Sequence, residues 1–120
     1  MANDFKRFTS ASLGTTTGAT ATAVYTVPSS GSAMESIVIG ITLSNKSASG
    51  ITADVFLDNY DGSNDVYIVK NASVPAGSSL EVMAGNKLVL QGNGTTNDAL
   101  RVSESASSAL DCTISVLEDV

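Results

Sequence analysis

The segment Asp58–Asp65, with the sequence DNYDGSND, carries the densest set of potential metal ligands in this 120-residue chain. The carboxylates of Asp58, Asp61 and Asp65 stand among asparagine amides, and hard cations such as Ca²⁺ prefer oxygen ligands of these kinds. The spacing is not that of an EF-hand loop and lacks its terminal glutamate, whereas Asp61-Gly62 is typical of an ordinary β-turn. The segment is therefore a candidate calcium site, with a solvated turn as the alternative.

The sequence contains few of the residues that enzymes usually use for catalysis. The chain contains no histidine, so Ser-His-Asp triads and histidine-based zinc sites are excluded. The other carboxylates are scattered, and we expect most of them to be solvated at strand ends or on outward positions. They are Glu35, Asp54, Glu81, Asp98, Glu104, Asp111, Glu118 and Asp119. The sequence therefore predicts neither an enzyme nor a resident cofactor.

The single cysteine, Cys112, has no partner for an internal disulfide. It shares one side of a period-two pattern with Ile114 and Val116, which is typical of a half-buried strand. We therefore expect Cys112 to be a buried structural thiol.

The charge balance argues against two classes of partner. Six basic residues stand against twelve acidic ones, for a net charge of −6, and clustered Lys and Arg that would neutralise phosphates are lacking. The sequence has no run of 18 apolar residues, and its start lacks the apolar core of a signal peptide. We expect a protein made in a cytoplasm that binds neither nucleic acid nor membrane.

The elements that position these residues are short β-type runs separated by Ser, Thr, Gly and Asn. Turn signals recur about every ten residues, a spacing typical of sandwiches and jelly rolls, and no stretch has a capped 3.6-residue stripe. The sequence predicts an all-β fold, an antiparallel β-sandwich or jelly roll of about eight strands with little or no helix. The clearest strands span 22–27, 35–45, 51–57, 66–70, 80–83, 87–91, 99–103 and 112–117.

The strand at 35–45 is the strongest core candidate. Period-two alternation places Ile37, Ile39, Ile41 and Leu43 on one face, so we expect this face to be buried. A polar turn follows and the chain resumes at Ile51 with a second alternating run, which predicts a hairpin between the two strands.

The chain divides into an N-terminal part, residues 1–21, and a single β-sandwich domain, residues 22–120. The first part is either an edge strand or an extended arm, followed by a Thr/Gly-rich connection. An arm would offer unpaired backbone groups that another subunit can complete by strand addition. The candidate interface residues are Phe5, Lys6, Arg7, Phe8 and Tyr60.

The chain resembles small virion structural proteins of tailed bacteriophages, particularly marine cyanophages, over nearly its whole length. The order of the matching phrases is more specific than any single one. In chain order they are Phe5–Thr9, Val24–Pro28, Ser36–Asn45, Tyr67–Asn71, Val74–Leu80, Lys87–Leu90 and Ile114–Glu118.

The resemblance implies a non-enzymatic β-sandwich or jelly-roll subunit located in the virion. We expect a capsid-surface decoration or cement subunit, because the sequence has no coiled-coil segment for a fibre shaft and its acidic charge suits an outer surface. Its implied partners are the major capsid protein or other virion proteins and further copies of itself, with a trimer by analogy.

Two alternatives stay open at this level. One is a tail, neck, baseplate or fibre component. The other is a host-glycan-binding module that uses the Asp58–Asp65 loop, in which Tyr60 is the sole aromatic residue available as a sugar platform.

Overall fold

The computed structural model describes residues 3–28, 34–62, 65–83 and 87–119. These ranges contain nine β-strands and one short 3₁₀ turn, η1 (Gly18–Thr20), and no helix in them is long and apolar enough to cross a membrane. The strands are β1 (Asn3–Ser10), β2 (Thr22–Thr26), β3 (Met34–Asn45), β4 (Ile51–Asp58), β5 (Val66–Val74), β6 (Ser79–Glu81), β7 (Leu88–Gly92), β8 (Ala99–Glu104) and β9 (Leu110–Asp119).

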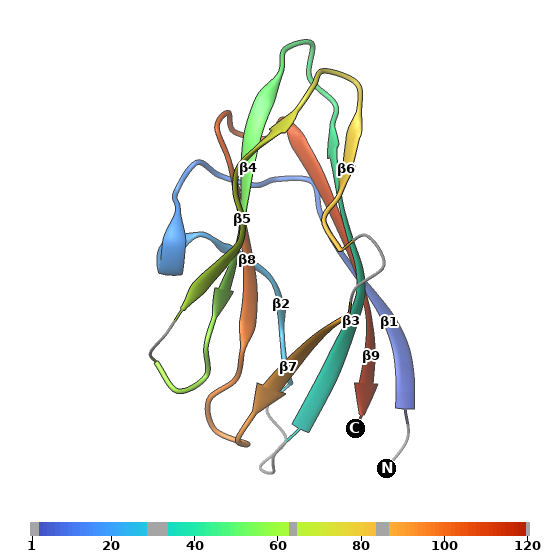
Figure 1. The fold of residues 1–120 in the computed structure, drawn as a ribbon, viewed down its shortest axis with the longest axis vertical. Helices are drawn as coiled ribbons and strands as arrows, with labels where there is room; N and C mark the ends of the chain where they lie inside the picture. Colours follow the sequence, from blue (N-terminus) through green and yellow to red (C-terminus); the bar gives the residue numbers. More distant parts are fainter. Residues whose placement is uncertain (1–2, 29–33, 63–64, 84–86, 120) are drawn as a thin grey trace.

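The strands form two antiparallel sheets that pack face to face (Figure 1). Sheet A has the order β1-β9-β3, and the far side of β3 pairs with β7 near its start and with β6 near its end. Sheet B has the order β2-β8-β4-β5. The prediction of an all-β antiparallel sandwich is therefore confirmed.

Strands near the two ends of the sequence pair with each other, and strands closer to its middle pair in turn. Strand β1 pairs with β9, β2 with β8, β3 with β6 and β7, and β4 with β5. Since β6 and β7 together occupy one position beside β3, the described strands fill eight positions in two four-position sheets. This rolled-up pairing is the topology of a jelly roll.

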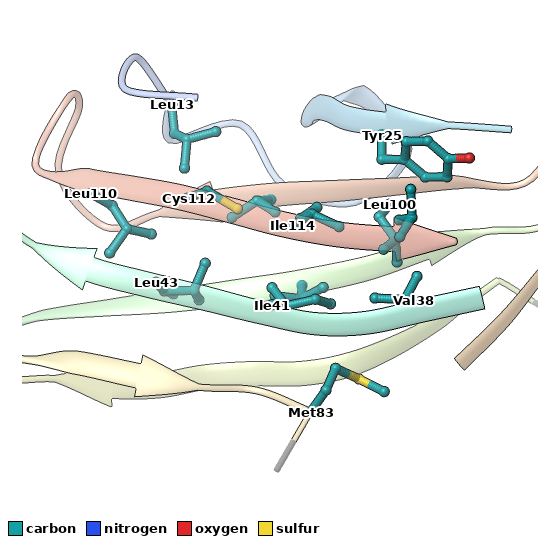
Figure 2. Close-up of a cluster of buried hydrophobic side chains, with 14 of the residues drawn as sticks. Leu13, Tyr25, Val38, Ile41, Leu43, Met83, Leu100, Leu110, Cys112 and Ile114 are labelled. Atoms are coloured by element: carbon teal, nitrogen blue, oxygen red, sulfur yellow. The ribbon is translucent and has the colours of Figure 1, made fainter. Parts of the chain in front are cut away.

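The core lies between the inner faces of the two sheets. In the register of β3 with β9, Leu43 pairs with Cys112 and Ile41 with Ile114, and these side chains are almost completely buried (Figure 2). Burial raises the pKa of the Cys112 thiol to about 12, so the thiol stays protonated at neutral pH. Cys112 is thus buried as predicted.

The predicted hairpin between 35–45 and 51–57 is wrong, because β3 and β4 lie in different sheets. The intervening turn crosses from one sheet to the other. The buried amide of Asn45 closes this crossing, since its Nδ2 donates to the carbonyls of Ser49 and Val74 at 2.8 and 2.9 Å and its Oδ1 accepts the backbone N–H of Ser47. A polar turn between two alternating runs fits either connection, and of these bonds the one to Val74 of β5 is the long-range contact that ties the turn to sheet B.

The predicted inner face of β3 is right for Ile41 and Leu43 and wrong for Ile37 and Ile39. The register with β9 shifts between Val38 and Gly40, where a β-bulge inserts an extra residue. Period-two counting fails across a bulge, so Val38 is buried while Ile39 is 42% exposed and Ile37 only partly buried.

The expectation that the scattered carboxylates are solvated is wrong for four of them. Asp54, Asp98, Glu104 and Glu118 are all at least nine-tenths buried. Asp54, Asp98 and Glu104 accept hydrogen bonds from backbone N–H groups, as in the 2.6 Å bond from the Asn71 N–H to Asp54. Irregular backbone near a core needs such acceptors, because its N–H groups lack ladder partners.

Glu104 gives a prediction about stability. Its Oε1 accepts the Ala109 N–H at 2.9 Å, while Oε2 is buried and has no hydrogen-bond partner among the described residues. Burial raises the pKa of Glu104 above its ordinary value of 4.5, and the Ala109 N–H offsets part of this effect. The folded state therefore disfavours the charged form, and this penalty grows as the pH rises above 4.5.

We expect Glu104→Gln to raise the free energy of unfolding at neutral pH, because glutamine keeps the acceptor for Ala109 without a buried charge. The gain should vanish below pH 4.5, where the native carboxyl is protonated in both states. Urea unfolding at the two pH values measures this. An equal difference between the two proteins at both pH values would contradict the prediction.

Candidate interaction surface

A row of apolar side chains crosses the outer face of sheet A. Phe5 of β1 pairs with Leu117 of β9, Leu117 pairs with Ile37 of β3, and Ile37 pairs with Val89 of β7. We call these four residues, together with the bulged Ile39, the apolar row. Phe5 is 78% exposed and Val89 54%.

The outward direction of the row follows from strand alternation. Leu117 lies between Val116 and Glu118, which are both completely buried, so its own side chain points to the opposite face. Val89 likewise precedes the buried Leu90. Single exposed apolar residues are ordinary, whereas a contiguous apolar patch marks an interaction surface.

Charged side chains flank the apolar row on its two sides. Arg7 lies two residues after Phe5 on the same face. It pairs with Ser115, which in turn pairs with Gly40 beside the β3 bulge, so Arg7 lies on that side of the row. Glu35 lies two residues before Ile37 on the same face, on the other side of the row. Both are exposed. An apolar centre between charged borders is the usual anatomy of a protein interface.

The inner face of β1 holds this strand to the sandwich. Lys6 Nζ lies 2.9 Å from Glu118 Oε1, and the Tyr25 hydroxyl donates to Glu118 Oε2 at 2.6 Å. The Tyr25 hydroxyl is also 2.7 Å from Ser36 Oγ, and its ring lies 4.7 Å from that of Phe8. The bond and ion pair with Glu118 raise the pKa of Lys6.

The structure therefore divides the predicted interface residues of β1 between two faces. Lys6 and Phe8 point inward and join β1 to β2 and β9, while Phe5 and Arg7 point outward. In the described part of the chain β1 pairs with β9 alone, so its other edge presents backbone groups without a strand partner. Such an edge can accept a strand from another chain.

Tyr60 is not part of sheet A. It lies in the loop that follows β4 of sheet B. Its backbone N–H donates to Asp98 Oδ1 at 2.7 Å, which fixes the start of this loop. The structure thus does not place Tyr60 on the outer face of sheet A.

The candidate calcium ligands are engaged with protein groups. Asp58 forms a 2.9 Å ion pair with Arg101, and Asp65 Oδ1 accepts the Asn59 N–H at 2.8 Å. Asp61 has interactions of its own. Within the described ranges, no three His, Cys, Asp or Glu side chains gather where they could hold a metal ion.

Sequence reasoning missed Ile37, Ile39, Val89 and Leu117 as surface residues. One signal was present, because Ile37-Val38-Ile39 is apolar on both faces of a strand, as in strands that are covered on both sides. The row itself could not be found, since it joins residues from four strands that are far apart in the chain.

No protein-family model matches the chain, and no curated protein matches it. Among solved structures, the chain is similar to a chain of the structure of infectious bursal disease virus Gx strain, with 12% sequence identity and a TM-score of 0.39. The similarity covers 98% of this chain and 37% of that chain. The chain thus spans little more than a third of the length of this neighbour.

Proposed function

We propose that the protein is a non-enzymatic virion structural subunit that works by protein–protein contact through the outer face of sheet A. More specifically, we propose a capsid-surface decoration or cement subunit of a tailed phage. The apolar row carries the proposal, because it is an exposed apolar centre with charged borders on a rigid sheet. Jelly rolls recur in viral capsid domains, which is compatible with this role.

The size of the apolar row sets the strength of a single contact. Fully burying a large apolar side chain contributes about 1.5–3 kcal/mol, so Phe5, Ile39 and Val89 together supply on the order of 5 kcal/mol. Association itself costs about 4–15 kcal/mol in lost translational and rotational freedom, so this gain leaves little or no net affinity for one isolated contact. Stable attachment then requires several linked contacts, which a homo-oligomer or a repeating lattice provides through avidity.

The two kinds of surface suit two kinds of partner. We assign the apolar row to the major capsid protein, with Arg7 and Glu35 setting the orientation of the contact. We assign the unpaired edge of β1 to a neighbouring copy of this protein, because strand addition uses backbone groups that every copy shares. This arrangement gives a homo-oligomer on the particle surface, for which a trimer remains the expectation.

The double variant Phe5→Ser, Val89→Ser tests the role of the row. Two lost apolar contacts should weaken binding to particles stripped of this protein on the order of 100-fold. Because both side chains are exposed, the free energy of unfolding should change by no more than about 0.5 kcal/mol per site. A co-sedimentation titration measures the binding.

The matched control is Thr9→Ser, Thr113→Ser, which changes the same outer face outside the row. This control should bind as tightly as the wild-type protein. The proposal fails if the Phe5/Val89 variant saturates particles at the same concentration as its control.

A further inference from the structure

The segment 11–21 crosses from β1 of sheet A to β2 of sheet B, with Leu13 in the core, and its later part, which includes η1, lies on the outer side of sheet B (Figure 1). Hydrogen bonds to β8 are among those that hold the segment beside sheet B. The Gly14 carbonyl accepts the Glu104 N–H at 3.1 Å, and the Ala21 carbonyl accepts from Arg101 Nη1 at 2.8 Å. Between this segment and sheet B lies a hollow of about 220 Å³.

Asp54 is a buried carboxylate in this hollow. It pairs with Ser103 across β4 and β8, and its neighbours Ala53 and Val55 belong to the core, so alternation directs Asp54 to the outer face of sheet B. It is nevertheless only 7% exposed. Since residues of the segment 11–21 line the same hollow, the segment accounts for this burial.

The two oxygens of Asp54 differ in their partners. Oδ1 accepts the Asn71 N–H at 2.6 Å, whereas Oδ2 lies 3.5 Å from Ser103 Oγ, at the outer limit of a hydrogen bond. Asn71 is held with a positive φ of 54°, an uncommon backbone conformation for a residue other than glycine. Asp54 therefore keeps capacity to accept a strong hydrogen bond from a bound molecule.

The remaining lining is rich in hydroxyl groups. Thr15 and Thr17 come from the covering segment. Thr52 lies near the start of β4, Ser103 near the end of β8, and Ser105 directly after β8. Each hydroxyl can donate one hydrogen bond and accept others. Together with the Asn71 amide, they present both donors and acceptors around the Asp54 carboxylate.

This chemistry favours one ligand class. Among the described residues no cationic side chain lines the hollow, and two of its lining residues are acidic, so it disfavours an anion. A calcium ion takes six to eight oxygen ligands with carboxylates prominent among them, whereas no three acidic groups gather in the described ranges. The volume is below the roughly 300–1,000 Å³ of pockets for drug-sized ligands.

We propose that this hollow binds a neutral polyhydroxylated ligand, a single monosaccharide unit of a glycan. Sugar hydroxyls donate to Asp54 Oδ2, and the threonine and serine hydroxyls donate to and accept from the ring substituents. The site lies apart from the loop at 58–65 that the sequence suggested for sugar binding. It is also independent of the apolar row, so it can hold whether or not the protein attaches to a capsid as proposed.

The test is a titration of the full chain with glucose, galactose, mannose and N-acetylglucosamine, followed by amide chemical shifts in ¹H–¹⁵N NMR spectra. At least one sugar should give saturable shifts at millimolar concentration, centred on Asn71, Ser103 and Thr17. Asp54→Asn keeps an acceptor for the Asn71 N–H but replaces Oδ2 by a donor, so we expect it to weaken binding more than tenfold. The matched control is Asp111→Asn, which alters an exposed ion pair with Lys46. This variant should bind the sugar as tightly as the wild-type protein does.

A second variant keeps the test decisive if Asp54→Asn does not fold. Thr17→Val removes an exposed hydroxyl of the covering segment and should weaken the same sugar several-fold, while Thr9→Val on sheet A should not. The proposal is overturned if no sugar gives saturable shifts, if the shifts centre elsewhere, or if CaCl₂ alone moves these amides and sugars do not.

Discussion

Replacing Asp98 with alanine should lower the free energy of unfolding by about 2–6 kcal/mol. Asp98 is only 4% exposed, and its carboxylate joins two segments of the chain. Oδ1 accepts the Tyr60 N–H at 2.7 Å, and Oδ2 accepts the Gln91 N–H at 2.9 Å. Alanine leaves both N–H groups without this acceptor, and each such loss costs about 1–3 kcal/mol in a buried setting.

The loss is large because a domain of this size has a total stability of only about 5–15 kcal/mol. Urea unfolding of the purified protein gives the value directly. Asp111→Ala is the matched control, because Asp111 forms an exposed ion pair with Lys46 that contributes at most about 1 kcal/mol. A change in Asp98→Ala no larger than in this control would show that the carboxylate does not hold the two segments together.

Replacing Tyr25 with phenylalanine should lower the free energy of unfolding by about 1.5–3 kcal/mol, the usual contribution of a hydrogen bond to a charged group. The Tyr25 hydroxyl donates to Glu118 Oε2 at 2.6 Å, and Glu118 is completely buried. Without this donor, Oε2 retains a buried charge without its hydrogen bond. Tyr25 also links the two sheets, because it comes from β2 while Glu118 and Ser36 belong to sheet A.

The effect of Tyr25→Phe should depend on pH. Burial, and then the bond to Glu118, raise the pKa of Tyr25 well above its ordinary value of 10.0. In the unfolded chain Tyr25 ionises from about pH 10 upward, while in the folded protein it stays neutral. The neutral Tyr25 hydroxyl thus makes its full contribution to the free energy of unfolding below pH 10. This contribution is lost as the pH rises toward the raised pKa of the folded state.

The difference between wild type and Tyr25→Phe should therefore shrink above pH 10, because phenylalanine does not titrate. The raised pKa of Lys6 acts in the same direction above 10.5 and is present in both proteins. Tyr67→Phe is the matched control, since Tyr67 is 36% exposed and packs beside Phe56. Urea unfolding at neutral and alkaline pH measures both variants. A Tyr25→Phe difference that is constant with pH would contradict the role of this hydroxyl.

The sequence was sufficient for the fold class because its signals are local. Period-two alternation through Cys112, Ile114 and Val116 identified the buried face of β9, and the turn residues separated the strands. Pairing was not predictable, since the crossing at Asn45 and the bulge at Ile39 depend on bonds to residues that are distant in sequence. A single bulge then reversed the predicted face of Ile37 and Ile39.

The candidate surface was predictable only in part for the same reason. Phe5 stood out as an aromatic residue in a short N-terminal segment, whereas Val89 and Leu117 gain meaning only once the register of sheet A places them in one row. The buried acids Asp98 and Glu118 look like ordinary surface charges in the sequence. Their acceptor roles depend on backbone and hydroxyl groups that the fold brings to them.

The most direct test of the proposed function is the copy number and position of this protein in purified virus particles. Quantitative mass spectrometry gives the number, and a symmetry-averaged electron-microscopy map gives the position. The proposal predicts hundreds of copies that follow the capsid lattice, with the outer face of sheet A against the capsid. A few copies at one vertex or along the tail would instead make it a neck, tail, baseplate or fibre component, and absence from the particles would contradict a virion structural role.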